Sequence, residues 1–297
     1  MAQICPTAKL EKLLLPTDGS EFNEGAIREA INLAKTCSSK IIAISVIETN
    51  PEYETIAPQL VEKAEKEARE HLESVKERAS KEGVECEIIA CHGEEPYKYI
   101  VEEAEKNKIN MIVMGRRGRT GIKRLMLGSV TAKVIGHTSS NVLVVPREAG
   151  IECKNIVAAT DGSQFGKTAV YEAIGIAKRC KSNLTIVTVI TYEDLVHIEH
   201  SRLRLTAAAD EEMIRIERNI KELKETAIKE GIPTEAFILS GIPAEAIINT
   251  AKTKNADLIV MGSHGRTGID RLLVGSVAER VILLSLSAVL VVKAGEK

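Results

Sequence analysis

Short apolar runs alternate with longer amphipathic stretches along the first half of the chain. The apolar runs are continuous and rich in β-branched and aliphatic residues, which is typical of strands buried on both faces. They cover residues 12–15, 41–47, 86–90, 109–114 and 141–145. Between the second and third runs, apolar residues recur every three or four positions from Leu60 to Val75, as on one face of a helix.

The same order of runs returns in the second half of the chain. Its apolar runs cover residues 155–159, 184–190, 235–239, 257–261 and 288–292. Strands that alternate with helices in this way form a parallel sheet, because each crossover helix packs back on the sheet. The pattern therefore predicts an α/β protein made of two tandem doubly wound domains, each with a five-stranded parallel sheet and helices on both faces.

Two motifs repeat together with this pattern. Thr-Asp-Gly-Ser at 17–20 returns at 160–163, and the segment GRRGRT at 115–120 returns as GSHGRT at 262–267. The offset between the copies grows from 143 to 147 residues, so about four residues entered the second copy, and we place them within 191–206. We expect domains over residues 1–147 and 152–297, joined by a short linker at 147–151.

A glycine-rich loop follows the fourth predicted strand of each copy, where an open α/β sheet binds ligands. It has the form G-x2-G-x9-G-S, at Gly115, Gly118, Gly128 and Ser129 and again at Gly262, Gly265, Gly275 and Ser276. Glycine lets the backbone approach an anion, and a helix that begins at the serine offers unpaired N–H groups to a phosphate. The alternative is a tight turn whose serine is an ordinary N-cap. Identical spacing in both copies favours phosphate binding, although the loop is neither a Walker A motif nor a GxGxxG fingerprint.

Composition narrows the function further. The 40 Lys and Arg residues against 42 Asp and Glu give a net charge of −2, which argues against a broad nucleic-acid surface. No apolar run approaches a membrane span and no signal-like start is present, so we expect a soluble, cytoplasmic protein without membrane contact. With only 3% aromatic residues, a ligand would be held by backbone and aliphatic groups.

Cysteine and histidine offer little chemistry in this sequence. The six cysteines lack the paired spacings of a zinc site, and we expect all of them to be thiols: Cys5, Cys37, Cys86, Cys91, Cys153 and Cys180. His197 and His200 could share a helix face, but no second ligand pair accompanies them. We therefore predict no metal site built from protein side chains.

The Thr-Asp-Gly-Ser turn and the G-x2-G-x9-G-S loop give the sequence a close resemblance to the universal stress protein family in its tandem, nucleotide-binding form. The resemblance covers nearly the whole chain in both copies. It implies the strand order 3-2-1-4-5 in each domain and one adenine nucleotide, ATP or AMP, per domain. A magnesium ion could accompany the nucleotide through its phosphates.

The resemblance also implies nucleotide-binding residues by position. In the first copy these are Pro16, Thr17, Asp18 and Val46 around adenine and ribose, and Gly115, Arg116, Gly118, Gly128, Ser129 and Val130 around ribose and phosphates. In the second copy they are Ala159, Thr160, Asp161, Val189, Gly262, Ser263, Gly265, Gly275, Ser276 and Val277. A carboxylate can accept a hydrogen bond from a ribose hydroxyl or an adenine amino group, but it could instead cap the following helix.

The two copies differ in charge beside the loop. Arg116 and Arg117 of the first copy become Ser263 and His264 in the second, so we expect the first site to prefer the more highly charged nucleotide. Further arginines recur in or near both loops and could reach phosphates or simply be exposed: Arg119, Arg124, Arg266 and Arg271.

Residues for catalysis are sparse. Phosphoryl transfer needs an oriented nucleophile, metal neutralisation and usually a placed base, whereas each copy offers a loop, one aspartate and flanking arginines. We expect a nucleotide-dependent switch or regulatory module with no catalytic residues, and at most slow ATP hydrolysis. One alternative is an ATP-hydrolysing or adenylyl-transferring enzyme, although the His-x-Gly-His and Lys-Met-Ser-Lys-Ser signatures of such transferases are absent.

A second alternative is a scaffold that pairs through strand edges. The fifth predicted strands, 141–145 and 288–292, are short and apolar. The family resemblance implies that they pair the two domains of one chain and then pair chains into a homodimer. The sequence identifies no downstream protein partner.

Overall fold

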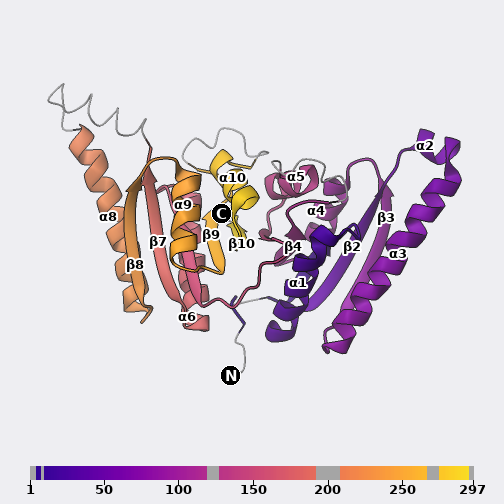
Figure 1. Cartoon of the computed structure of the whole chain (residues 1–297), viewed down its shortest axis with the longest axis horizontal. Helices are drawn as coiled ribbons and strands as arrows, with labels where there is room; N and C mark the ends of the chain where they lie inside the picture. Colours follow the sequence, from indigo (N-terminus) through magenta and orange to yellow (C-terminus); the bar gives the residue numbers. More distant parts are fainter. Residues whose placement is uncertain (1–4, 8–9, 119–126, 192–207, 266–273, 294–297) are drawn as a thin grey trace. The chain divides into compact units, whose positions relative to one another are not determined.

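A computed structural model describes residues 5–7, 10–118, 127–191, 208–265 and 274–293 of the chain. The chain divides into two compact units, and the division falls between Gly150 and Ile151. Each unit is an α/β domain with a parallel sheet and flanking helices (Figure 1).

Five parallel strands form the sheet of the first unit. They are β1 (Lys12–Pro16), β2 (Lys40–Glu48), β3 (Cys86–Gly93), β4 (Met111–Gly115) and β5 (Asn141–Val145). Their pairing gives the order β3-β2-β1-β4-β5, which confirms the expected 3-2-1-4-5 order. Leu13 of β1 lies opposite Ile41 of β2 and Met111 of β4.

Helices cover both faces of this sheet. They are the single turn η1 (Glu21–Asn23) and helices α1 (Glu24–Cys37), α2 (Pro51–Ile56), α3 (Pro58–Lys81), α4 (Pro96–Lys106) and α5 (Ser129–His137). Helix α1 packs on β1 and β4, α3 packs on β2 and β3, and α4 packs against α5. Because the crossovers reverse direction after β3, right-handed connections place α4 and α5 on the opposite face from α1 and α3. Accordingly, Leu13, Leu14 and Leu15 of the central strand are fully buried.

The second unit repeats this architecture. Its strands are β6 (Asn155–Ala159), β7 (Asn183–Ile190), β8 (Thr234–Ser240), β9 (Leu258–Gly262) and β10 (Ala288–Val292), in the order β8-β7-β6-β9-β10. Its helices are α6 (Gln164–Cys180), α8 (Ala208–Lys229), α9 (Pro243–Thr253) and α10 (Ser276–Leu284). The four additional residues expected within 191–206 fall almost wholly outside the described part of the chain. Across the described residues, no helix is both long and apolar enough to cross a membrane.

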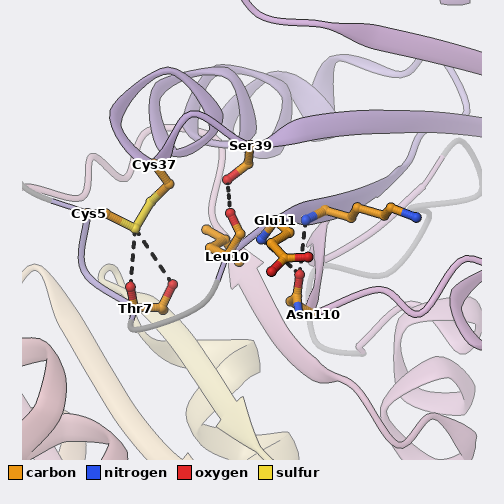
Figure 2. The surroundings of a disulfide bond; sticks show 8 residues. Cys5, Thr7, Leu10, Glu11, Cys37, Ser39 and Asn110 are labelled. Carbon is orange, nitrogen blue, oxygen red and sulfur yellow. Dashed lines mark hydrogen bonds between the residues drawn. A yellow bond between two sulfur atoms is a disulfide. The ribbon is translucent and has the colours of Figure 1, made fainter.

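One expectation about the cysteines is wrong. Cys5 and Cys37 form a disulfide, with their Cα atoms 4.6 Å apart, whereas the sequence analysis expected thiols throughout. Figure 2 shows Cys5 of the N-terminal segment beside Cys37, the last residue of α1. The two cysteines are 32 residues apart in the sequence, and only the fold brings the segment before β1 to the end of α1, so their pairing could not be predicted from the sequence. Cys86, Cys91, Cys153 and Cys180 are not disulfide-bonded.

Candidate functional site

In the first unit, the carboxyl ends of β1, β2 and β4 border a cavity of about 350 Å³. The Thr-Asp-Gly-Ser turn after β1 forms one side, and the glycine loop with the start of α5 forms another. The predicted first-copy positions that line this cavity are Pro16, Thr17, Asp18, Val46, Gly115, Gly118, Gly128, Ser129 and Val130. The volume lies near the lower end of the range typical of small-molecule sites.

The second unit has an equivalent cavity of about 300 Å³ at the carboxyl ends of β6, β7 and β9. Every predicted second-copy position lines it: Ala159, Thr160, Asp161, Val189, Gly262, Ser263, Gly265, Gly275, Ser276 and Val277. The fold thus brings the turn after the first strand of each unit against the loop after the fourth, although about a hundred residues separate them in the chain.

Arg116 is the predicted position that the structure places elsewhere. It lines a smaller cavity of about 120 Å³ together with Phe22, Arg117 and Arg147. Burial and the neighbouring charge of Arg117 lower the pKa of Arg116. Arg117 borders both this arginine cavity and the larger cavity of the first unit. The sequence pattern singled out Arg116 of this pair, whereas Arg117 is the one that lines the larger cavity.

The aspartate of each turn spans the gap to the glycine loop. Oδ1 of Asp18 accepts hydrogen bonds from the Ser20 N–H at 2.9 Å and from Nδ2 of Asn23 at 2.6 Å. Oδ2 of Asp18 faces Gly118 so closely that a Cβ at that position would overlap it. One carboxylate oxygen therefore organises the turn, and the other lies against the loop.

Asp161 repeats this arrangement in the second unit. Its Oδ1 accepts a hydrogen bond from the Ser163 N–H at 3.0 Å, and a Cβ at Gly265 would lie 2.8 Å from its Oδ2. The N-cap of α6 is Ser163, whose hydroxyl accepts from the Gly166 N–H. The aspartate is therefore not the helix cap, which was the alternative role considered from sequence.

Helices α5 and α10 both begin at the end of the glycine loop. Their N-cap residues are Gly128 and Gly275, so Ser129 and Ser276 are the first helical residues rather than N-caps. This disagrees with the interpretation of these serines as ordinary caps. Glycine has no side chain with which to accept hydrogen bonds from the first amides, so these groups and the positive end of the helix dipole stay available to an anion.

Backbone hydrogen bonds close each glycine loop on itself. The Gly128 N–H donates to the Arg116 carbonyl at 3.0 Å, and the Gly275 N–H donates to the Ser263 carbonyl at 2.9 Å. In the first unit, the buried Thr131 hydroxyl also donates to the Gly115 carbonyl at 3.0 Å. The end of β4 and the start of α5 are thereby held together at the cavity edge.

Aliphatic side chains form the remaining walls. Val46 of β2 and Ile100 of α4 face the first cavity, while Val189 of β7 and Ile247 of α9 face the second. Sequence reasoning missed the contribution of α4 and α9, which also bring a proline from the first turn of each helix to the cavity. A proline a few residues after the third predicted strand of each copy, Pro96 and Pro243, was the available signal.

Polar residues distinguish the two cavities. The first has Glu48 and Arg117 in its wall, and the second has Thr191 and His264. His264 is largely buried, with its Nδ1 2.9 Å from the Ser263 hydroxyl and its ring 5.4 Å from the Phe165 ring. The predicted loss of positive charge in the second copy therefore falls at the cavity itself. The remaining loop arginines lie outside the described residues: Arg119, Arg124, Arg266 and Arg271.

The fold and these cavities define a pair of doubly wound α/β domains, each with a cavity at the carboxyl edge of its sheet. The chain belongs to the universal stress protein family, since the family model matches residues 9–146 and again 152–293. The universal stress protein MJ0531 of Methanocaldococcus jannaschii is 38% identical over 145 residues, which cover 46% of this chain and 82% of that protein. The protein YxiE of Bacillus subtilis is 32% identical over 147 residues, covering 45% of this chain and 97% of its own.

A solved structure matches both units together. The crystal structure of a universal stress protein from Archaeoglobus fulgidus is 25% identical, with a TM-score of 0.72, and the match covers 96% of this chain and 99% of that one. A putative universal stress protein from Pseudomonas aeruginosa, with a TM-score of 0.66 and 16% identity, shows the same fold. The tandem arrangement of this chain therefore has full-length structural counterparts.

Proposed function

We propose that each unit binds one adenine nucleotide, ATP or AMP, at the carboxyl edge of its sheet, and that the protein acts as a nucleotide-dependent regulatory module. The observation that carries this proposal is the repeated cavity between the aspartate turn and a glycine-capped helix start. Two copies of one arrangement, with the same loop spacing, favour a shared ligand class over two incidental turns.

The phosphates would occupy the start of α5 or α10. Both helices have nine residues and a glycine N-cap, and their first residues, Ser129 and Ser276, are exposed. An anion at such a helix start gains hydrogen bonds from the first amides and a favourable dipole interaction. The serine hydroxyl adds a further donor. In the first unit, Arg117 at the cavity wall would add a charge-assisted hydrogen bond.

The base and ribose would occupy the deeper, aliphatic part of each cavity. Val46 and Ile44 of the first unit correspond to Val189 and Val187 of the second, and all four line the cavities. These side chains can contact a purine ring without aromatic stacking. Oδ2 of the aspartate, which lies against the glycine loop, would accept from a ribose hydroxyl or the adenine amino group.

The two units would differ in nucleotide preference. Arg117 and the adjacent arginine cavity make the loop of the first unit more cationic than the Ser263–His264 segment of the second. We therefore assign ATP, with magnesium held through its phosphates, preferentially to the first unit. The second unit would bind AMP about as well as it binds ATP.

A charge placed at the helix start tests this proposal. Ser129→Glu and Ser276→Glu each put a carboxylate where the phosphate would bind, yet an acidic residue in the first turn favours the helix itself. We expect each variant to retain its thermal stability and to lose nucleotide binding in its own unit. Isothermal titration calorimetry with ATP and with AMP should then give a stoichiometry of one nucleotide per chain instead of two.

Ser129→Gln and Ser276→Gln are the matched neutral controls, since they have nearly the same size without the charge. They should keep two sites, with affinity reduced only by the lost hydroxyl. Unchanged binding in both glutamate variants would exclude the helix starts as the phosphate site. Incubation of the wild type with ATP and magnesium, with product analysis, distinguishes a switch from a slow ATP-hydrolysing or adenylyl-transferring enzyme.

Assembly and location remain part of the proposal. Pairing of β5 and β10 within and between chains and a homodimer are predictions from the family resemblance, and a cytoplasmic location is a prediction from the pattern of apolar residues. Analytical ultracentrifugation with and without nucleotide would test the homodimer and show whether the ligand changes it.

A further inference from the structure

Both units end the helix that follows their first strand in the same way. Cys37 is the last residue of α1, and Cys180 is the last residue of α6. The next residue in each chain segment adopts a left-handed conformation, with φ of 54° at Ser38 and 58° at Lys181. These two helix ends are therefore matched positions in the repeat.

A serine then fixes each helix end to the segment that leads into the first strand. The Ser39 hydroxyl donates to the Leu10 carbonyl, as Figure 2 shows, and the Ser182 hydroxyl donates to the Cys153 carbonyl. The backbone hydrogen bonds of the following residues also correspond. The Lys40 N–H donates to the Glu11 carbonyl and the Asn183 N–H donates to the Lys154 carbonyl, both at 2.9 Å. Cys153 thus stands at the position that Leu10 holds in the first unit.

A second sulfur meets the helix-terminal cysteine in both units. In the first unit, Cys5 reaches Cys37 from the N-terminal segment and forms the disulfide (Figure 2). In the second unit, Cys153 takes this place beside Cys180, since the Ser182 hydroxyl, two residues after Cys180, donates to the Cys153 carbonyl and the Cys153 side chain is the main group that lowers the pKa of Cys180. The two units therefore bring different partners to one matched position, and the sulfur pair is linked in one unit and reduced in the other.

The environment of Cys180 differs from that of the other thiols. The hydrogen bond with Cys153 is the main cause that lowers the pKa of Cys180, and its side chain is partly exposed. Burial instead raises the pKa of Cys86 to about 11, and burial also raises the pKa of Cys91. Because the thiolate is the reactive form, Cys180 is the thiol best suited to attack a disulfide.

We propose that Cys153 and Cys180 are an oxidation site that forms a second intramolecular disulfide by exchange with a low-molecular-weight disulfide. The Cys180 thiolate attacks one sulfur of that disulfide, which gives a mixed disulfide and releases one thiolate. Cys153, after losing its proton to solvent, attacks the Cys180 sulfur and displaces the second thiolate. The protein loses two hydrogens and the small disulfide is reduced to two thiols. The product ties the end of α6 to the segment before β6, as the first unit ties α1.

Oxidised glutathione is the probe for this proposal. The full chain is reduced, freed of reductant under nitrogen, incubated with oxidised glutathione, alkylated and digested for mass spectrometry. We expect a disulfide-linked peptide that joins Cys153 to Cys180, whereas Cys86 and Cys91 should still be thiols after the incubation and should therefore be found in alkylated form. The peptide that links Cys5 to Cys37 serves as the internal positive control. In a Cys5→Ser/Cys37→Ser background, oxidation should raise the Tm by roughly 5–10 °C.

Two variants separate the roles of the pair. Cys153→Ser should leave a lasting glutathione adduct on Cys180, since no thiol remains to resolve it. Cys180→Ser should leave Cys153 almost unmodified, because Cys153 is buried. The proposal is overturned if the wild-type chain keeps a stable glutathione adduct on Cys180 or keeps both thiols alkylated. The wild-type digest decides this even where a variant folds poorly.

Discussion

Replacing Gly118 by alanine tests the contact between the aspartate turn and the glycine loop. A Cβ at this position would overlap Oδ2 of Asp18, and the carboxylate has little room to move, because its other oxygen accepts from Ser20 and Asn23. The loop or the carboxylate must shift. Overpacking of this kind, or the loss of one or both hydrogen bonds, costs about 1–3 kcal/mol.

We expect that cost to appear in nucleotide binding to the first unit. A loss of about 1–3 kcal/mol raises the Kd by roughly fivefold to 150-fold. Isothermal titration of Gly118→Ala with ATP should therefore show one site of wild-type affinity and one weakened site. Gly265→Ala, whose Cβ would lie 2.8 Å from Oδ2 of Asp161, should weaken the other site instead.

Gly150→Ala is the matched control. A Cβ at Gly150 would meet no atom within 4 Å, so this variant should bind two nucleotides as the wild type does. Thermal unfolding of all three variants separates loss of binding from loss of fold. If Gly118→Ala and Gly265→Ala are folded and still bind two nucleotides with wild-type affinity, the geometry described for the aspartate and the loop has no part in binding.

Three further predictions concern charge and stability. Arg117→Gln should weaken ATP more than AMP in the first unit, with a smaller dependence on salt, and titration at two ionic strengths checks this. Cys37→Ser should lower the stability of the first unit by about 4 kcal/mol in chemical denaturation, because the disulfide closes a loop across 32 residues; an unchanged midpoint would refute it. Burial lowers the pKa of Lys293 to about 8, so the folded state loses this proton at a lower pH than the unfolded state does. The free energy of unfolding should therefore rise from pH 8 to 10. Lys293→Met should remove that rise and stabilise the second unit at pH 7 by at most about 3 kcal/mol, measured by denaturation at both pH values.

The strands could be predicted because they follow from burial, whereas the strand order was an expectation from the family resemblance. A strand covered by helices on both faces must be apolar at successive positions, and runs such as 155–159 and 288–292 coincide with β6 and β10. Because the pattern of apolar runs occurs twice in the chain, each predicted strand was supported by its counterpart in the other copy. The end of β3 was predicted too early, since the structure extends this strand to Gly93, three residues beyond the predicted run.

Contacts between distant segments could not be predicted in the same way. The Cys5–Cys37 disulfide depends on where the N-terminal segment lies against the end of α1, and neither cysteine has a spacing that signals its partner. The different placements of Arg116 and Arg117 depend on side-chain direction within a loop, which has no periodicity to reveal it. Spacing could locate the loop, but only the fold could show which of its side chains face the cavity.

Native mass spectrometry of the purified full chain, with added ATP or AMP, tests the central claim most directly. Each unit has a cavity of about 300–350 Å³ that is bordered by an aspartate turn and a glycine-capped helix. We therefore predict a series of peaks that ends at two nucleotides per chain, and at one nucleotide for Ser129→Glu or Ser276→Glu. A wild-type chain that binds neither ATP nor AMP would contradict the account and leave both glycine loops as structural turns.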